Sequence, residues 1–268
     1  MISYPQKEHY DLEDFRRIIA ILRHPGGCPW DMEQDHRSIR RNFIEETYEV
    51  CEAIDTDDTG LMREELGDVM MQVFFHASIE EDAGHFDIND VADQAVRKLI
   101  FRHPHVFGDR SVSGTGEVLR NWDELKRQEK QQRSTTDTLN AVARTLPALW
   151  RAEKIQSKAA KTGFDWPDVH GALEKVEEER QELAQAAEGQ GDAAEELGDL
   201  LFAAVNVARK LGIDPEVALN QATEKFIARF QRVESGALRT GQRLDQLTPD
   251  ELLALWQRSK YMEESTDE

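Results

Sequence analysis

The sequence lacks several features that mark common classes of protein. Its only two cysteines, Cys28 and Cys51, form no Cys-x-x-Cys motif and no disulfide framework of a small domain, so a reducing compartment is expected. No apolar run approaches the roughly 20 residues that a membrane helix needs. The first residues, Met-Ile-Ser-Tyr-Pro-Gln-Lys-Glu, are too polar for a signal peptide. These absences predict a cytoplasmic protein that does not associate with membranes.

The sequence also has too little positive charge for a protein that binds nucleic acid polymers. The 268 residues include 53 acidic and 33 basic side chains, which give a net charge of −20. A surface this acidic repels nucleic acid polymers and anionic membranes. It remains compatible with a small anionic ligand, because bound cations can reverse the local electric field.

Signals for β-strands are nearly absent, whereas helical periodicity runs through the chain, which predicts an all-α fold. Apolar side chains at helical spacing predict the first five helices, which lie around residues 12–22, 39–54, 66–74, 91–102 and 118–125. Residues 127–138 contain no apolar side chain and predict a frayed helix end followed by a linker.

Three local signals predict helix ends in the second half. Asp214 precedes Pro215 and is predicted to cap a helix at its N-terminus. Thr248 and Glu251 have the spacing of a capping box, and Gly212 suits the end of the preceding helix.

The two halves of the chain resemble each other, which predicts two duplicated helical domains at residues 1–134 and 135–268. Glu-Glu-x-x-Glu occurs twice, followed each time by Glu-x-x-Asp, Lys-x-x-x-Arg and Trp-x-x-x-Lys in the same order. In the first half these motifs contain Glu45, Glu46, Glu49, Glu65, Asp68, Lys98, Arg102, Trp122 and Lys126. In the second half they contain Glu178, Glu179, Glu182, Glu196, Asp199, Lys225, Arg229, Trp256 and Lys260.

The spacing of the acidic residues indicates a metal site. Residues three apart lie on one helix face, so Glu46 and Glu49 point the same way, and so do Glu65 and Asp68. Two such helices packed antiparallel would gather four carboxylates whose repulsion favours protonation or a bound cation. Ligands that offer only oxygen favour magnesium, manganese or calcium over zinc.

Each motif also has a simpler interpretation. Glu-x-x-Glu is common on solvated helix faces, particularly in a chain in which 53 of 268 residues are acidic. Lys225 and Arg229 share a helix face and could bind phosphate or line a solvated flank. Trp256 could stack on a base or anchor the last helix. Recurrence of the whole series, rather than any single motif, supports a triphosphate site.

Together with Gly26-Gly27-Cys28-Pro29-Trp30-Asp31 and Gln34, the repeated motifs resemble those of the MazG-type all-α nucleoside triphosphate pyrophosphohydrolases. The resemblance covers nearly the whole chain and implies tandem helical bundles. It implies hydrolysis of NTPs and dNTPs between the α- and β-phosphates, in a role of nucleotide-pool sanitation. It further implies Mg²⁺ as cofactor, Mn²⁺ as its substitute, and a homodimer or higher homo-oligomer.

The resemblance also implies roles for individual residues, and we favour the second half as the catalytic one. Its catalytic carboxylates would be Glu178, Glu179, Glu182, Glu196 and Asp199, of which all but Glu178 are metal ligands. Its nucleotide-binding residues would be Lys225, Arg229, Trp256 and Lys260. The first-half metal ligands would be Glu46, Glu49, Glu65 and Asp68. The second half departs from the pattern because Lys161-Thr162-Gly163-Phe164-Asp165-Trp166 replaces the glycine-rich opening.

Two alternatives remain open. A di-iron carboxylate bundle would need paired Glu-x-x-His motifs, and only Glu33-x-x-His36 occurs, without a repeat. A non-catalytic helical scaffold or regulatory protein would need no divalent metal. His103-x-His105 has no counterpart in the second half and is assigned no role.

Overall fold

The computed structural model describes residues 4–264, and every regular element in that range is a helix. The all-α prediction is confirmed. The chain divides into two compact units, Met1–Lys126 and Arg127–Glu268. The predicted domain boundary between residues 134 and 135 stays a prediction.

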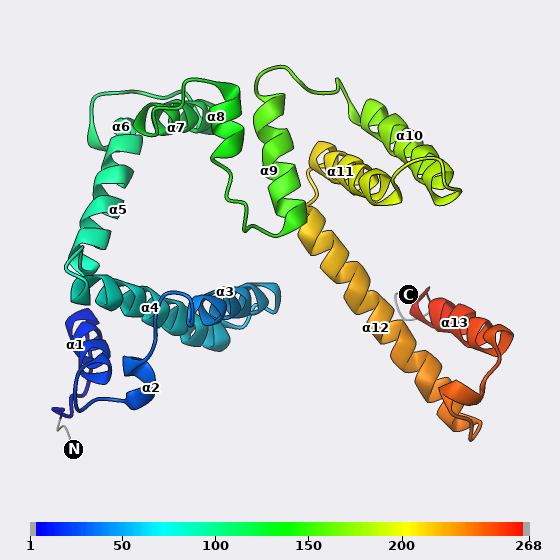
Figure 1. The fold of residues 1–268 in the computed structure, drawn as a ribbon, viewed down its shortest axis with the longest axis horizontal. Coiled ribbons are helices and arrows are strands. Elements are labelled where there is room, and N and C mark those ends of the chain that lie inside the picture. Colours follow the sequence, from blue (N-terminus) through cyan, green and yellow to red (C-terminus); the bar gives the residue numbers. More distant parts are fainter. Residues whose placement is uncertain (1–3, 265–268) are drawn as a thin grey trace. The chain divides into compact units, whose positions relative to one another are not determined.

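The first unit is formed around two long helices, α3 and α4, which pack against each other (Figure 1). Helix α4 also contacts α1 and α5. The helices of this unit are α1 (Leu12–Arg23), α2 (Pro29–Met32), α3 (Arg40–Asp55), α4 (Thr59–Asp82), α5 (Ile88–Arg102), α6 (Pro104–Phe107) and α7 (Thr115–Glu129), which extends past the division.

The second unit repeats this plan, with α10 and α11 as its closest pair, and α12 packs on α13 and α9. Its helices are α8 (Thr135–Asn140), α9 (Ala148–Ala160), α10 (Val169–Ala187), α11 (Ala193–Leu211), α12 (Pro215–Arg239) and α13 (Pro249–Glu264), with a 3₁₀ turn at Leu244–Gln246.

Short connections hold each long helix pair antiparallel. Asp58 begins α4 by accepting hydrogen bonds from the backbone N–H groups of Gly60 and Leu61. Asp192 begins α11 in the same way by accepting from the N–H of Ala194. Because the connections are this short, residues near the end of the first helix face residues near the start of the second. The two acidic motifs occupy these positions in both units.

The three predicted helix ends in the second unit are confirmed. Asp214 Oδ1 accepts hydrogen bonds from the backbone N–H groups of Glu216 and Val217, whose nitrogen atoms lie 2.9 and 3.1 Å from it. Thr248 and Glu251 form the reciprocal capping box. Gly212 ends α11 in the left-handed conformation with φ of 68°.

The predicted linker is partly wrong, because residues 135–140 form helix α8. Ser134 and Asp137 form a capping box, in which each side chain accepts a hydrogen bond from the other's backbone N–H. Thr138 is buried, with 4% of its surface exposed. A capping box thus begins a short helix in which Leu139 is the one apolar residue, too few for a periodic pattern.

The apolar cores of the two units differ in side-chain size. Ile19, Ile39, Phe74 and Phe75 form the buried cluster of the first unit. The second unit buries mainly small apolar residues, namely Val142, Ala172, Ala186, Ala203, Val205, Val233 and Ala237. Larger side chains of α11 stay about half exposed in the described chain, namely Leu197, Leu201 and Phe202.

Replacement of Gly212 by alanine should destabilise the second unit by about 1 kcal/mol, because a Cβ atom disfavours the left-handed conformation. Apart from Gly212 itself, its immediate chain neighbours and the backbone of its own helix, no heavy atom of the described residues lies within 4 Å of the position that this Cβ would take. The cost is therefore conformational rather than a clash. Guanidinium unfolding followed by circular dichroism measures the change. Gly212→Asn is the control and should lose much less free energy of unfolding, since asparagine tolerates the left-handed conformation. Equal losses for both variants would contradict the explanation.

Candidate metal centre

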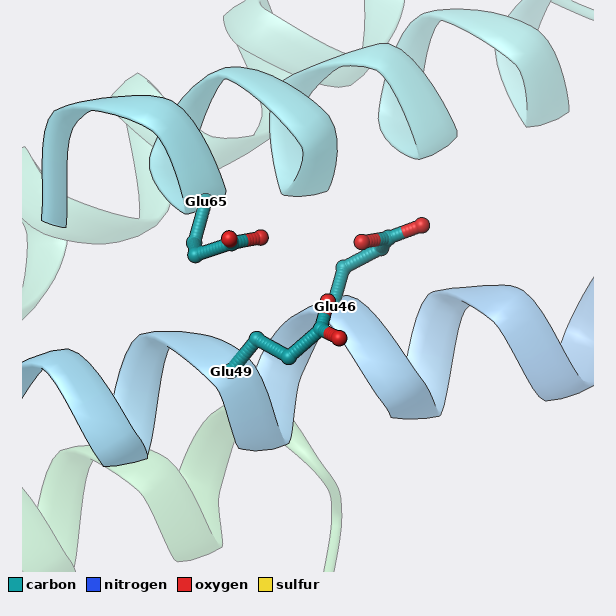
Figure 2. Close-up of side chains that lie close together, drawn as sticks. All are labelled: Glu46, Glu49 and Glu65. Atoms are coloured by element: carbon teal, nitrogen blue, oxygen red, sulfur yellow. The ribbon is translucent and has the colours of Figure 1, made fainter. Parts of the chain in front are cut away.

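In the first unit, the structure brings three predicted ligands together across α3 and α4. Glu46, Glu49 and Glu65 each offer one carboxylate oxygen, and these three atoms lie within 4.8 Å of one another (Figure 2). Glu65 is 8% exposed. Asp68 is not a member of this three-atom group, although its charge raises the pKa of both Glu46 and Glu65.

The electrostatics of this first group reflect crowding of like charges. Burial, a hydrogen bond with Glu49 and repulsion from Asp68 raise the pKa of Glu46 from 4.5 to about 6. Burial and repulsion from Glu49 and Asp68 also raise the pKa of Glu65. Without a cation, the group therefore retains a proton more readily than isolated carboxyls do.

The second unit gathers the corresponding side chains across α10 and α11. Oxygens of Glu179, Glu196 and Asp199 lie within 4.8 Å of one another. Burial raises the pKa of Glu196, and repulsion from Glu182 and Glu179 adds to the shift. Glu182 is thus an electrostatic neighbour of the group, although it does not supply one of the three oxygens.

Glu179 is the most buried member of either group, with 4% of its surface exposed. Its Oε1 accepts a hydrogen bond from the ammonium of Lys175 at 2.6 Å, whereas its buried Oε2 has no hydrogen-bond partner among the described residues. A buried carboxylate oxygen without a partner is costly unless a ligand binds to it. This atom, within a group of oxygen donors only, fits a hard divalent cation such as Mg²⁺ or Mn²⁺.

The predicted nucleotide-binding residues occupy the other helix pair of the second unit. Lys225 and Arg229 lie on α12, and Trp256 and Lys260 lie on α13. The Lys260 ammonium lies 5.9 Å from the centre of the Trp256 ring. The ring also packs on Phe226, with centroids 5.2 Å apart. Of the predicted side chains, the structure thus brings together the carboxylates Glu179, Glu196 and Asp199 and, on α13, Trp256 with Lys260. The roles of all the predicted residues stay predictions.

The matching residues of the first unit have different surroundings. The guanidinium carbon of Arg102 lies 5.9 Å from the centre of the Trp122 ring. His103 packs edge-on against the same ring at a centroid distance of 4.9 Å. Lys98 lies on α5 and Lys126 on α7. The sequence pattern assigns no role to His103, but the structure places it beside Trp122, the counterpart of Trp256 in the first half.

The sequence motifs also miss a histidine network in the first unit. His36 Nδ1 lies 2.7 Å from His76 Nδ1, and His36 Nε2 lies 2.6 Å from a Glu80 oxygen. His85 contacts the other oxygen of Glu80 at 2.7 Å. The spacing of His76 and Glu80 on α4 could have predicted their shared face, but the approach of His36 depends on tertiary packing. In this arrangement His36 is paired with Glu80 rather than with Glu33 of the Glu-x-x-His motif.

Comparison with known proteins identifies the family of this site. Residues 34–107 and 168–233 match the MazG nucleotide pyrophosphohydrolase domain, once in each unit. The chain belongs to this family. The MazG resemblance and the tandem all-α fold are thereby confirmed, and both matched segments contain the carboxylate groups.

Two MazG relatives align along almost their full length. The nucleoside triphosphate pyrophosphohydrolase/pyrophosphatase MazG of Thermotoga maritima is 42% identical over 253 residues, which cover 94% of this chain and 97% of that protein. The nucleoside triphosphate pyrophosphohydrolase of Escherichia coli K12 is 42% identical over 251 residues, which cover 92% of this chain and 95% of that protein. The uncharacterized protein YabN of Bacillus subtilis is 45% identical over 258 residues, which cover 95% of this chain but 53% of that protein.

The raised pKa of Glu46 predicts how stability depends on pH in the absence of metal. The folded state holds the Glu46 proton more tightly than the unfolded chain does. The resulting stabilisation is complete at pH values below 4.5, the ordinary pKa of a glutamate. It is lost as pH rises through about 6, the pKa of Glu46 in the folded protein. The whole shift corresponds to at most about 2 kcal/mol, and solvent screening reduces it.

Denaturant unfolding in EDTA at pH 5.5 and 7.5 measures this dependence. Glu46→Gln should lose less stability between the two pH values than the unaltered protein does. Glu45→Gln is the control and should behave like the unaltered protein, since its side chain belongs to no carboxylate group. If Glu46→Gln shows the same pH dependence as the unaltered protein, the explanation is wrong.

Proposed function

We propose that this protein hydrolyses nucleoside triphosphates to nucleoside monophosphates and pyrophosphate. The observation that carries the proposal is the Glu179–Glu196–Asp199 group, with its buried and unpartnered Glu179 oxygen. Membership of the MazG family and the names of the two full-length relatives support the same reaction.

The proposed cofactor is Mg²⁺, with Mn²⁺ as its substitute. Glu179, Glu182, Glu196 and Asp199 would hold it in the second unit. Glu46, Glu49, Glu65 and Asp68 would do so in the first. A bound divalent cation offsets the charge of a triphosphate and lowers the pKa of a coordinated water.

The protein's own residues would bind and orient the substrate. Lys225 and Arg229, four residues apart on α12, suit the phosphate oxygens, because arginine binds them through two N–H groups and lysine acts as a point charge. The Trp256 ring offers a face for a base, with Lys260 beside it. A carboxylate of the group that is not fully engaged with metal would accept the proton of the attacking water.

The proposed reaction is a displacement at the α-phosphorus. The water oxygen forms a bond with the α-phosphorus while the bond from that phosphorus to the α–β bridging oxygen breaks. The released group is pyrophosphate, and the nucleoside keeps one phosphate. We favour the second unit as the main catalytic site, because Glu179 is its most buried ligand and has a free oxygen. Broad nucleotide-pool sanitation in the cytoplasm is the proposed cellular role.

The proposal includes a homodimer or higher homo-oligomer. Leu197, Leu201 and Phe202 of α11 are exposed by 47%, 52% and 45% in the single chain. Apolar side chains clustered on one helix face are typical of surfaces that contact another protein. In the described range, no helix is long and apolar enough to cross a membrane.

The alternative is a helical scaffold or regulatory protein without catalysis. Its function would survive loss of the carboxylates, whereas a pyrophosphohydrolase would not tolerate that loss. The di-iron alternative predicts bound iron and colour in the purified protein. Metal analysis therefore separates it from a magnesium enzyme.

Product analysis with each NTP and dNTP in Mg²⁺ tests the proposed reaction. We expect monophosphate and pyrophosphate, with activity lost in EDTA and restored by Mg²⁺ or Mn²⁺. Glu179→Gln should lower kcat at least about a hundredfold, because the site loses charge that stabilises the transition state. The same change at Glu46 shows how much the first unit contributes. Glu188→Gln, an exposed position at the end of α10, is the matched control. Diphosphate with orthophosphate, or no turnover, would contradict the proposal.

A further inference from the structure

Lys175 is a positive charge built into the second carboxylate group. Its ammonium lies 2.6 Å from Glu179 Oε1 and 2.9 Å from Glu178 Oε1. Lys175 is one helical turn before Glu179 on α10, so the contact requires no other element. The Lys175 side chain is 37% exposed and that of Glu179 is 6% exposed. A lysine side chain carries a positive charge at neutral pH.

The first group lacks a lysine at the equivalent position. When Glu45-Glu46 is aligned with Glu178-Glu179, the position of Lys175 is occupied by Asn42. The two groups therefore share their carboxylates but differ in the residue one helical turn before the second glutamate, which is a lysine in one and an asparagine in the other.

This difference matters for cation binding. A divalent cation at Glu179, Glu196 and Asp199 would be close to the Lys175 ammonium, because both contact Glu179. Like charges at such distances repel, and burial of Glu179 strengthens the repulsion. In the absence of a cation, the same ammonium compensates the buried charge of Glu179, which would otherwise be strongly unfavourable.

We propose that Lys175 is an internal counterion that weakens divalent-cation binding at the second group and stabilises that group when no cation is bound. Lys175 is a positioning residue in this role, since it acts through Glu179. The inference rests on the proposed metal-dependent function. It predicts that the first group, which lacks this lysine, binds Mg²⁺ more tightly than the second.

Calorimetric titration of the full chain with Mg²⁺ tests the proposal, with Mn²⁺ and electron paramagnetic resonance as a second probe. Glu49→Gln with Glu65→Gln disables the first group, so that only the second is measured. In this background, Lys175→Asn should bind Mg²⁺ about tenfold more tightly. Lys175→Arg keeps the positive charge and is the matched control. Its affinity for Mg²⁺ should be close to that of the same background with Lys175 unchanged. Equal or weaker binding by Lys175→Asn overturns the proposal.

Thermal unfolding gives a readout that is independent of activity. In EDTA, Lys175→Asn should lower the melting temperature of the protein, and Mg²⁺ should restore most of it. The rise in melting temperature that Mg²⁺ causes should therefore be larger in Lys175→Asn than in the Lys175→Arg control. An equal increase in both variants also overturns the proposal.

The reciprocal change keeps the test valid if Lys175→Asn does not fold. With the second group disabled by Glu179→Gln and Glu196→Gln, Asn42→Lys should weaken Mg²⁺ binding at the first group about tenfold. Unchanged binding contradicts the counterion explanation. Failure of the metal assignment itself is distinguishable, because Glu179→Gln would then leave Mg²⁺ binding intact in the background with a disabled first group.

Discussion

Repulsion between carboxylates held in the narrow space between two antiparallel helices is the interaction on which this structure depends. Each unit places three such oxygens within 4.8 Å of one another, and burial prevents water from fully screening their charge. Aspartate caps and short connections keep each helix pair in register against this repulsion. The charge must then be compensated by a proton, a side chain or a bound cation, and the chemistry of the site follows from that requirement.

The two units meet the requirement differently although they share one plan. In the first, burial and the neighbouring carboxylates raise the pKa of Glu46 to about 6. In the second, Lys175 compensates Glu179 and leaves one carboxylate oxygen without a partner. The histidine network on α4 is a further difference, because residues aligned with His76 and Glu80 in the second unit are Val207 and Leu211. Duplication has thus kept the ligands while their surroundings have diverged.

The predicted helix ends show how far local sequence signals reach. Asp214, Gly212 and the Thr248–Glu251 capping box behave as predicted, because each depends on hydrogen bonds or backbone conformation within a few residues. The same kind of local interaction formed α8 inside the predicted linker. A search for apolar periodicity misses a helix of six residues that begins at a capping box and packs on α9.

By itself, the sequence determined the all-α class, the duplication and the candidate carboxylates, because helical spacing and the order of motifs are properties of a linear chain. Only the tertiary structure decided which oxygens converge, since Glu182 and Asp68 satisfy the motif yet lie outside the three-atom groups. It also decided that Glu179 is buried with one oxygen free and that His36 approaches His76. Convergence and burial depend on how separate helices pack, and spacing along one helix does not specify that packing.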